Sequence, residues 1–273
     1  MADDDVTVLM AVYHGDRGSW VDEALGSLVA QTRPAQEIVI VEDGPIGADV
    51  DDVLTRRSQE LPMTRLRLPR NVGLAGALQA GLSACRTELV ARADSDDLNE
   101  PTRLAEQLAA MKARPQLSVL SGYVSEFADD SRASYAVRTV PVGVAAVARA
   151  ARWRSPVNHP AVMFRRSDVL AVGGYQGFVG VEDYFLWGKL LAAGHEIDNL
   201  PAVLVRMRAG TSQARRRGGW RYAATEARLF REFVSIGFMT WPQAVAGLVV
   251  RLPVRLVPDG ARTIVYRRLL RRR

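Results

Sequence analysis

The sequence lacks the features that mark exported, disulfide-stabilised or repetitive proteins. It contains one cysteine, Cys85, among 273 residues, which excludes an internal disulfide and a zinc site built from several thiolates. Its first residues, MADDDVTVLMAVY, are acidic ahead of an apolar run, whereas a secretory leader needs a basic start. No internal repeat and no long low-complexity linker occurs. We therefore expect a globular protein that is not exported, with one continuous domain and a C-terminal appendage.

A glycine-rich phosphate-binding loop is also missing after the first predicted strand. No G-x-G-x-x-G motif lies there, which disfavours a dinucleotide dehydrogenase. No glycine-rich loop containing lysine lies there either, which argues against a nucleotidyltransferase.

The net charge of +6 is unevenly distributed along the chain. Residues 201–273 contain 16 arginines and three acidic residues, which gives 16 − 3 = +13, so the first 200 residues carry 6 − 13 = −7. An acidic body with a basic C-terminal region predicts that this region meets an anionic surface.

Short apolar segments rich in β-branched residues alternate with segments of helical spacing up to about residue 130. The predicted strands are 6–13, 37–44, 63–69, 88–94 and 116–127, and the predicted helices are 20–32, 47–60, 74–85 and 101–113. Farther along, we expect helices at 142–153 and 181–194 and strands at 159–166 and 198–210. This order predicts an α/β fold, with a mostly parallel central sheet and helices on both faces. Ligands of such sheets bind beyond the carboxyl ends of the strands.

Three carboxylates, Asp94, Asp96 and Asp97, follow one of these strands in the segment ARADSDDLNEP. Their mutual repulsion is costly unless water or a cation neutralises it. A hard cation such as Mg²⁺ or Mn²⁺ fits a set of carboxylates, but an acidic helix N-terminus explains the same residues equally well. An EF-hand is disfavoured because the loop lacks the required glycine and terminal glutamate.

Three other segments carry candidate ligand-binding residues. Asp43 ends the strand in EIVIVEDG, where a carboxylate can accept hydrogen bonds from a nucleobase or ribose. Asn71 and Gly73 open RNVGLAGALQAGL, whose small residues let a backbone approach a ligand closely. Glu182 and Asp183 begin a predicted helix after a glycine-rich loop. Each of these segments by itself also fits a purely structural role.

In combination, these segments resemble a known family. The matching segments are MAVY, SLVAQTRPAQEIVIVEDG, NVGLAGALQAGL, ARADSDD with EPTRL, NHPAVMFRRS, GGYQ and EDYFLW. In this order they resemble the inverting nucleotide-sugar glycosyltransferases of family 2, which have the GT-A fold, over residues 6–210. The part from Asn158 onward most resembles the non-processive branch that builds bacterial exopolysaccharide and O-antigen units.

The resemblance implies a donor site for a nucleoside-diphosphate sugar, with UDP as the expected nucleotide, and Mn²⁺ or Mg²⁺ as the cofactor. Asp94, Ser95 and Asp96 match the family's D-x-D motif. Asp94 would lie near the ribose and donor sugar, and Asp96 would ligate the metal, with Asp94 as a second candidate ligand. The other residues implied at the donor site are Ala11 and Tyr13 in a wall of the nucleobase pocket, Asp43 as a partner of the base, Asn71 and Gly73 as close contacts, and Arg92 as a partner of phosphate or sugar. For Arg92 a surface ion pair is an equal alternative.

The resemblance also implies the catalytic residues. Asp183, beside Glu182, would be the general base that removes the proton of an acceptor hydroxyl as this attacks the anomeric carbon. Attack opposite the leaving group inverts the anomeric configuration, and the metal stabilises the leaving diphosphate. A glycosidase would instead need a carboxylic acid near the leaving oxygen. His159 is expected to line the acceptor or diphosphate region or to be a core histidine, and Arg206 and Arg208 to close over the diphosphate or to contact nothing.

One departure from the family narrows the reaction. Processive members carry a Q-x-x-R-W motif, whereas SQARRRGGW places its glutamine, arginine and tryptophan at another spacing. We therefore expect transfer of a single sugar to a glycan or lipid-linked acceptor. Two other classes stay open: a nucleotidyltransferase or sugar-nucleotide hydrolase, and a catalytically silent membrane-docking scaffold of the same fold.

We assign residues 1–212 to the glycosyltransferase domain and residues 213–273 to a basic, partly amphipathic helical region. Residues 233–250 lack charges, but Pro242, Gln243 and two glycines weaken the case for a membrane-spanning helix. The basic tail predicts instead that a cytoplasmic protein makes peripheral contact with anionic lipid at the inner face of the cell membrane. A helix packed on the body with a solvated basic rim is the alternative. Nucleic acid is not expected as a partner, because no recognition motif accompanies the arginines.

Overall fold

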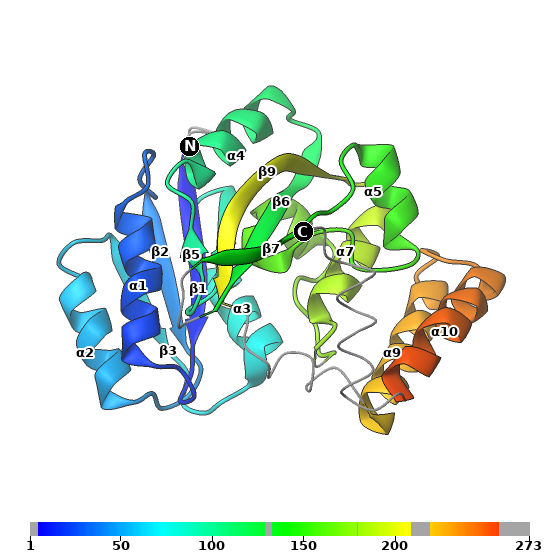
Figure 1. Ribbon diagram of the computed structural model, residues 1–273, viewed down its shortest axis with the longest axis horizontal. Coiled ribbons are helices and arrows are strands. Elements are labelled where there is room, and N and C mark those ends of the chain that lie inside the picture. The colour runs from blue at the N-terminus through cyan, green and yellow to red at the C-terminus, as the bar shows by residue number, and fades with distance from the viewer. Residues whose placement is uncertain (1–4, 129–132, 179, 209–218, 257–273) are drawn as a thin grey trace.

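The computed structural model describes residues 5–128, 133–178, 180–208 and 219–256 (Figure 1). The predicted domain boundary after residue 212 lies outside these ranges, as does most of the basic loop around it.

The elements follow one another much as the sequence predicts. The strands are β1 (Val6–Val12), β2 (Glu37–Glu42), β3 (Met63–Arg67), β4 (Leu89–Ala93), β5 (Leu98–Asn99), β6 (Leu117–Phe127), β7 (Ser134–Arg138), β8 (Met163–Arg165) and β9 (Glu196–Arg208). The helices are α1 (Gly18–Val29), α2 (Ala48–Arg57), α3 (Gly73–Ala84), α4 (Arg103–Ala113), α5 (Val144–Ala151), α6 (Arg166–Ala171), α7 (Glu182–Ala192), α9 (Trp220–Ser235) and α10 (Trp241–Leu256), with a 3₁₀ turn, η1 (His159–Ala161).

One predicted strand is shorter than expected. The segment 159–166 begins with the 3₁₀ turn η1, and only Met163–Arg165 pair as β8. Pro160 explains the difference, because proline has no N–H to donate to a strand ladder and its ring fixes φ. The other predicted elements end within three residues of the observed ones.

The nine strands of the described residues form one sheet, in the order β3-β2-β1-β4-β8-β6-β9-β5, with β7 paired to β6. β1 to β4 are parallel, and β6 and β9 share their direction, because β8 is antiparallel to both β4 and β6. β5, β7 and β8 run the other way. The predicted α/β class with a mostly parallel sheet is therefore confirmed, and the antiparallel strands β7 and β8 explain why the alternation fades after about residue 130.

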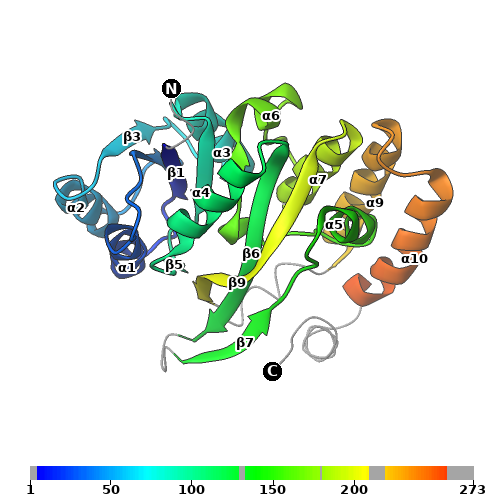
Figure 2. The same ribbon diagram turned by 90° about the horizontal axis from the view of Figure 1, so that it is seen from above.

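Helices cover both faces of the sheet (Figures 1 and 2). Successive residues of a strand point to opposite faces, so Met10 of β1 packs in the core shared with α1, α2 and α4, where it joins Leu25. Leu9 points to the other core, which contains Leu78 of α3 and Trp187 of α7. Burial on both faces explains why the strands of the parallel part are nearly continuous apolar runs.

α9 and α10 form a helical hairpin at the end of the molecule remote from α2 (Figure 2). α9 packs on α7 through an aromatic cluster formed by Phe178, Tyr184, Phe185, Phe230, Phe233 and Phe238. Within the described ranges, no helix has both the length and the apolar character needed to cross a bilayer.

Candidate active site

The residues predicted to bind the donor gather at one edge of the sheet. β2, β1 and β4 are parallel neighbours, so their carboxyl ends lie side by side. Asp43 directly follows β2, Tyr13 follows β1 and Asp94 follows β4. Ala11, within β1, is partly buried, whereas Tyr13 is exposed.

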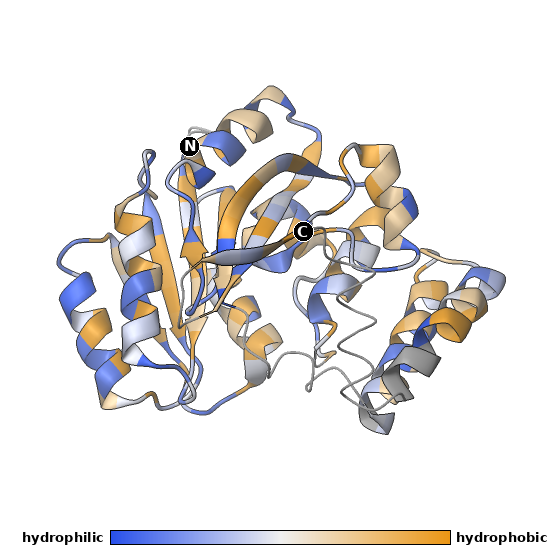
Figure 3. Ribbon diagram, viewed as in Figure 1, coloured by the Kyte–Doolittle hydropathy of each residue, from blue (hydrophilic) through white to orange (hydrophobic). Residues whose placement is uncertain are grey.

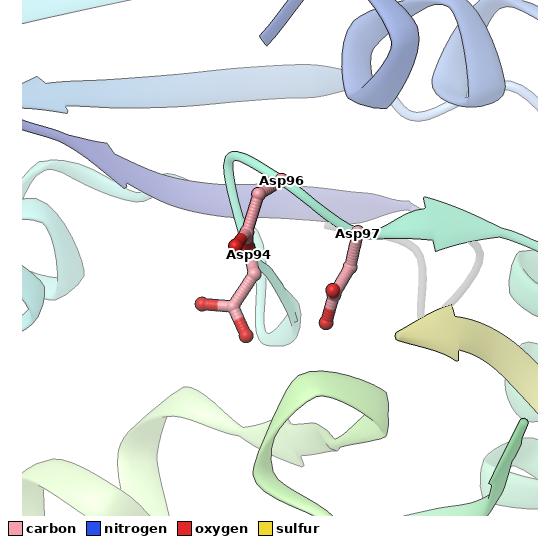
Figure 4. A group of neighbouring side chains, drawn as sticks. All are labelled: Asp94, Asp96 and Asp97. Atoms are coloured by element: carbon pink, nitrogen blue, oxygen red, sulfur yellow. The ribbon is translucent and has the colours of Figure 1, made fainter. Parts of the chain in front are cut away.

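The loop between β4 and β5 carries the acidic cluster (Asp94, Asp96 and Asp97). One carboxylate oxygen from each lies within 4.8 Å of the others, and the three side chains extend to the same side of the loop (Figure 4). β9 holds this loop in place: the backbone N–H of Arg208 donates to Asp97 at 2.9 Å, and the Arg208 Nε donates to the Asp96 carbonyl at 3.0 Å. The fold thus concentrates negative charge at the end of β4.

Arg92 neutralises one member of the cluster. Its guanidinium forms a two-pronged ion pair with Asp94. Arg92 is only 3% exposed, whereas the Asp94 side chain is 28% exposed, so Arg92 forms the ion pair considered for this residue, but from a buried position beneath the surface. Its Nε has no hydrogen-bond partner among the described residues. The predicted contact of Arg92 with phosphate or sugar stays a prediction.

Burial and repulsion disfavour the ionised forms of the other two members of the cluster, Asp96 and Asp97. Burial, together with repulsion from Asp94 and Asp16, raises the pKa of Asp96 from 3.8 to about 6. Burial and repulsion from both neighbours in the cluster raise the pKa of Asp97 well above 3.8. A divalent cation would relieve this repulsion, and a donor set made only of oxygen suits Mg²⁺ or Mn²⁺. The cluster therefore fits the predicted metal, with Asp96 and Asp94 as its candidate ligands.

Asp16 joins this site, although the sequence analysis did not select it. Its carboxylate accepts a hydrogen bond from the Tyr13 backbone N–H at 3.0 Å and is hydrogen-bonded to Ser95. Burial, with the charge of Asp94 nearby, raises the pKa of Asp16 to about 6. Asp16 lies in the loop after β1, so the rule that ligands bind at strand ends was the signal that could have found it.

Asp43, Asn71 and Gly73 form one structural unit. The two carboxylate oxygens of Asp43 accept hydrogen bonds from the backbone N–H groups of Val72, at 2.6 Å, and Gly73, at 3.0 Å. The Asn71 side chain donates to the Asp43 carbonyl at 3.1 Å, and Gly73 has a φ of 80°, which favours glycine. Asp43 thus fixes the start of α3. Its predicted contact with the base would use the remaining lone pairs of the carboxylate.

Glu182 and Asp183 form the first turn of α7, where the helix dipole favours negative charge. Glu182 is 8% exposed, and its Oε2 is buried without a hydrogen-bond partner among the described residues. Burial and the charge of Asp183 raise the pKa of Glu182. The pair therefore holds one carboxylate oxygen that no described side chain satisfies.

Tyr175 connects this pair with the acidic cluster. Burial raises the pKa of the Tyr175 hydroxyl above its usual range; the charge of Arg92 acts against this change, and those of Asp183, Glu182 and Asp94 add to it. These charges come from segments far apart in the chain, and they all act on one buried tyrosine. Its importance was not evident from the sequence, because GGYQ carries no chemical motif of its own.

His159 supports Tyr175 from the core. Its Nε2 lies 3.0 Å from the Tyr175 hydroxyl, and its ring meets the edge of Trp187 at 6.0 Å. Burial, with the positive charge of Arg92, lowers the pKa of His159 well below 6.5, so the ring is neutral at physiological pH. This placement fits the core-histidine alternative.

Arg103 is a buried residue that the sequence analysis did not select. It is 1% exposed and donates to the backbone carbonyls of Arg92, at 2.7 Å, and Val162, at 3.1 Å. It also donates to Gln107 and Asn99. Burial and the nearby Arg92 lower the pKa of Arg103 to about 9. Arg103 thus ties α4 to the end of β4, directly before the acidic cluster.

Arg206 and Arg208 belong to β9 and not to a free loop. The Arg208 guanidinium pairs with Glu23 at 2.7 Å and lies over the rings of Trp20 and Phe127. Arg206 also lies over Phe127, at 5.2 Å. Arg208 is buried and its guanidinium is held by Glu23. The hypothesis that this basic segment closes over the diphosphate therefore now concerns only residues outside the described ranges.

Comparison with known sequences identifies a family. A family model described as glycosyl transferase family 2 matches residues 7–173. The chain is 33% identical to the amylovoran biosynthesis glycosyltransferase AmsE of Erwinia amylovora, over 95% of this chain and 97% of the relative. It is 35% identical to the UDP-Gal:alpha-D-GlcNAc-diphosphoundecaprenol beta-1,3-galactosyltransferase of Escherichia coli, over 100% of this chain and 99% of the relative.

Solved structures share the fold. Staphylococcus aureus TarS 1–349 in complex with UDP-GlcNAc has a TM-score of 0.64 at 16% identity, covering 84% of this chain and 66% of that chain. The mannosyltransferase PcManGT from Pyrobaculum calidifontis, in complex with GDP-Man and Mn²⁺, has a TM-score of 0.59 at 18% identity, covering 97% of this chain and 79% of that chain. These similarities confirm the predicted GT-A fold.

Proposed function

Because this chain belongs to glycosyl transferase family 2 and is therefore a glycosyltransferase, we propose that it transfers one sugar from a UDP-linked donor to a glycan or lipid-linked acceptor, with inversion at the anomeric carbon. The Escherichia coli relative, similar over its full length, is named for a UDP-Gal donor and a diphosphoundecaprenol-linked acceptor. The Erwinia relative is named for amylovoran biosynthesis. Both names support a role in polysaccharide assembly.

The charge balance of the site is the observation that carries metal assistance. The site gathers six carboxyl groups, those of Asp16, Asp94, Asp96, Asp97, Glu182 and Asp183, beside the guanidinium groups of Arg92, Arg103 and Arg208. A nucleoside diphosphate adds further negative charge, which such a site repels unless a cation accompanies it. We propose that Asp96 and Asp94 hold Mn²⁺ or Mg²⁺, which supplies positive charge at the leaving diphosphate.

Asp183 is the proposed general base. It takes the proton of the acceptor hydroxyl as the hydroxyl oxygen bonds to the anomeric carbon and the bond from that carbon to the diphosphate oxygen breaks. Tyr175 supports this role, because the charges of both Asp183 and Asp94 act on its hydroxyl. Glu182 offers its unsatisfied oxygen to a substrate hydroxyl.

We further propose that residues 1–212 carry catalysis and that residues 213–273 contact anionic lipid at the inner face of the cell membrane. The basic balance of the C-terminal region supports this division. A lipid-linked acceptor would then reach the site from the bilayer to which the protein is bound.

A donor screen tests the proposal. Melting temperatures should rise with UDP-Gal or UDP-GlcNAc in the presence of Mn²⁺ and rise less without it, because a ligand that binds only the folded protein stabilises it. Transfer to a synthetic lipid-diphosphate acceptor, followed by NMR of the new anomeric centre, should show inversion. If no UDP-sugar shifted the melting temperature and no transfer occurred, the proposed donor would be wrong.

A further inference from the structure

α10 is apolar on two opposite sides. Its inner side packs on α9, where Gly247 lets the ring of Phe230 approach so closely that a Cβ at this position would overlap it. All exposed residues between 241 and 250 are apolar as well. They form the outer face of α10: Trp241, Pro242, Val245, Ala246, Val249 and Val250.

This outer face is unusual for a helix at the surface. Trp241 and Val245 are 60% and 53% exposed, and Val249 and Val250 are 66% and 63% exposed. A helix that is apolar all round is normally buried, and a contiguous exposed apolar patch marks an interaction site. α10 is the outermost helix of the hairpin, with α9 between it and α7 (Figure 2), and apolar residues run along it (Figure 3). The outer face of α10 is therefore a candidate interaction surface.

The chemistry of the neighbouring sequence favours lipid over protein. Residues 251–273 contain eight arginines and one aspartate, a balance of 8 − 1 = +7. Anionic headgroups attract such a segment, and tryptophan prefers the boundary between headgroups and acyl chains. A second copy of this chain is a less suitable partner, because it would bring two basic segments together. A membrane-spanning role does not fit either, since α10 is among the helices that lack the length and apolar character to cross a bilayer.

We propose that the outer face of α10 inserts into the headgroup boundary of an anionic bilayer, with the helix lying along the membrane surface. This inference deepens the proposed function, on which it rests, because it names the surface that makes the membrane contact. The hairpin packs on α7, which begins at Glu182. Insertion of α10 would therefore hold the base at a set distance from the bilayer.

A matched pair of double variants of the full chain tests the proposal. Val245→Ser/Val249→Ser removes apolar side chains from the outer face, and Val29→Ser/Val142→Ser makes the same change at two residues that are 47% and 43% exposed elsewhere. Serine and valine have similar helix propensities, so α10 stays helical. In co-sedimentation with phosphatidylglycerol–phosphatidylethanolamine vesicles, the first variant should bind at least about tenfold more weakly than wild type, because each apolar side chain lost from the bilayer costs on the order of 1 kcal/mol or more. The second should bind like wild type, and phosphatidylcholine vesicles should bind all three weakly.

Other results would overturn the inference. One such result is that the wild-type protein does not bind the vesicles, and another is that both variants bind them equally. A third is that the wild-type protein is a dimer in sedimentation velocity and only Val245→Ser/Val249→Ser is a monomer. Donor-induced melting shifts and transfer to a water-soluble acceptor report the proposed function separately, and both should be unchanged in the two variants. Vesicle binding without any transfer would count against the proposed function and leave the docking surface intact.

Discussion

Replacing Asp96 with asparagine should stabilise the ligand-free protein while removing metal-dependent donor binding. Burial and the charges of Asp94 and Asp16 raise the pKa of Asp96 from 3.8 to about 6. Since one pH unit corresponds to about 1.4 kcal/mol, keeping this carboxylate ionised costs the folded state roughly 3 kcal/mol at neutral pH. Asparagine has nearly the same shape without the charge. For a chain of this size, recovery of about 3 kcal/mol raises the melting temperature by roughly 5 °C.

The pH dependence of this gain follows from the direction of the pKa change. The folded-state pKa of Asp96 lies above its usual value of 3.8, so wild-type stability falls as the pH rises from 3.8 through about 6. The advantage of Asp96→Asn should therefore be complete above about pH 6 and vanish toward pH 4.

Differential scanning fluorimetry with UDP, with and without Mn²⁺, measures both effects. Wild type should show a larger UDP-induced shift with Mn²⁺ than without it, and Asp96→Asn should show no such difference. Asp52→Asn makes the same chemical change at an exposed site on α2 and serves as the control. The reasoning is refuted if the ligand-free variant is no more stable than wild type at pH 7.5, or if its response to Mn²⁺ equals that of wild type.

Three further substitutions test the rest of the site. Asp183→Asn should lower the transfer rate at least about 100-fold, the usual worth of a general base, with donor affinity unchanged in calorimetry; normal turnover would exclude Asp183 as the base. Tyr175→Phe removes the hydroxyl that is hydrogen-bonded to His159. It should lower kcat and shift the pH profile of kcat, because the charged groups around this hydroxyl would lose a polar neighbour. If the pH profile is unchanged and only the melting temperature falls, Tyr175 has a structural role alone. Arg103→Met leaves the buried carbonyls of Arg92 and Val162 without this donor. It should lower the free energy of unfolding in urea by about 1–3 kcal/mol, the usual cost of a buried acceptor left unsatisfied, with partial recovery in Arg103→Lys; a loss below about 1 kcal/mol would contradict this role.

Sequence patterns predicted which candidate residues share one edge of the sheet, because local structure determines where each strand ends. β1, β2 and β4 are apolar runs, and a parallel sheet places whatever follows them at one edge. Asp43 and Asp94 were therefore predictable as neighbours, although they lie far apart in the chain. Asp16 obeys the same rule, but the loop around it contains no recognised motif.

Residues whose position depends on tertiary packing were not predictable. A core position was one of the two alternatives predicted for His159, but its contact with Tyr175 joins two segments whose sequence patterns give no sign of each other. β5 has only two residues, and its existence depends on pairing with β9 and not on propensity. Arg103 reads as an ordinary exposed arginine at a helix start, and only the carbonyl groups around it explain its burial.

The packing of α7 joins the proposed general base to the proposed membrane-docking helix α10. Gly188 of α7 has no side chain, and a Cβ there would overlap the ring of Phe233 on α9. Gly247 of α10 admits Phe230 of α9 in the same way. Close approach at two successive interfaces fixes α10 to α9 and α9 to α7, since interiors packed this densely yield little. The orientation of Asp183 relative to the outer face of α10 is therefore set by side-chain packing, so a substitution that enlarges either glycine should change transfer to a membrane-embedded acceptor more than transfer to a water-soluble one.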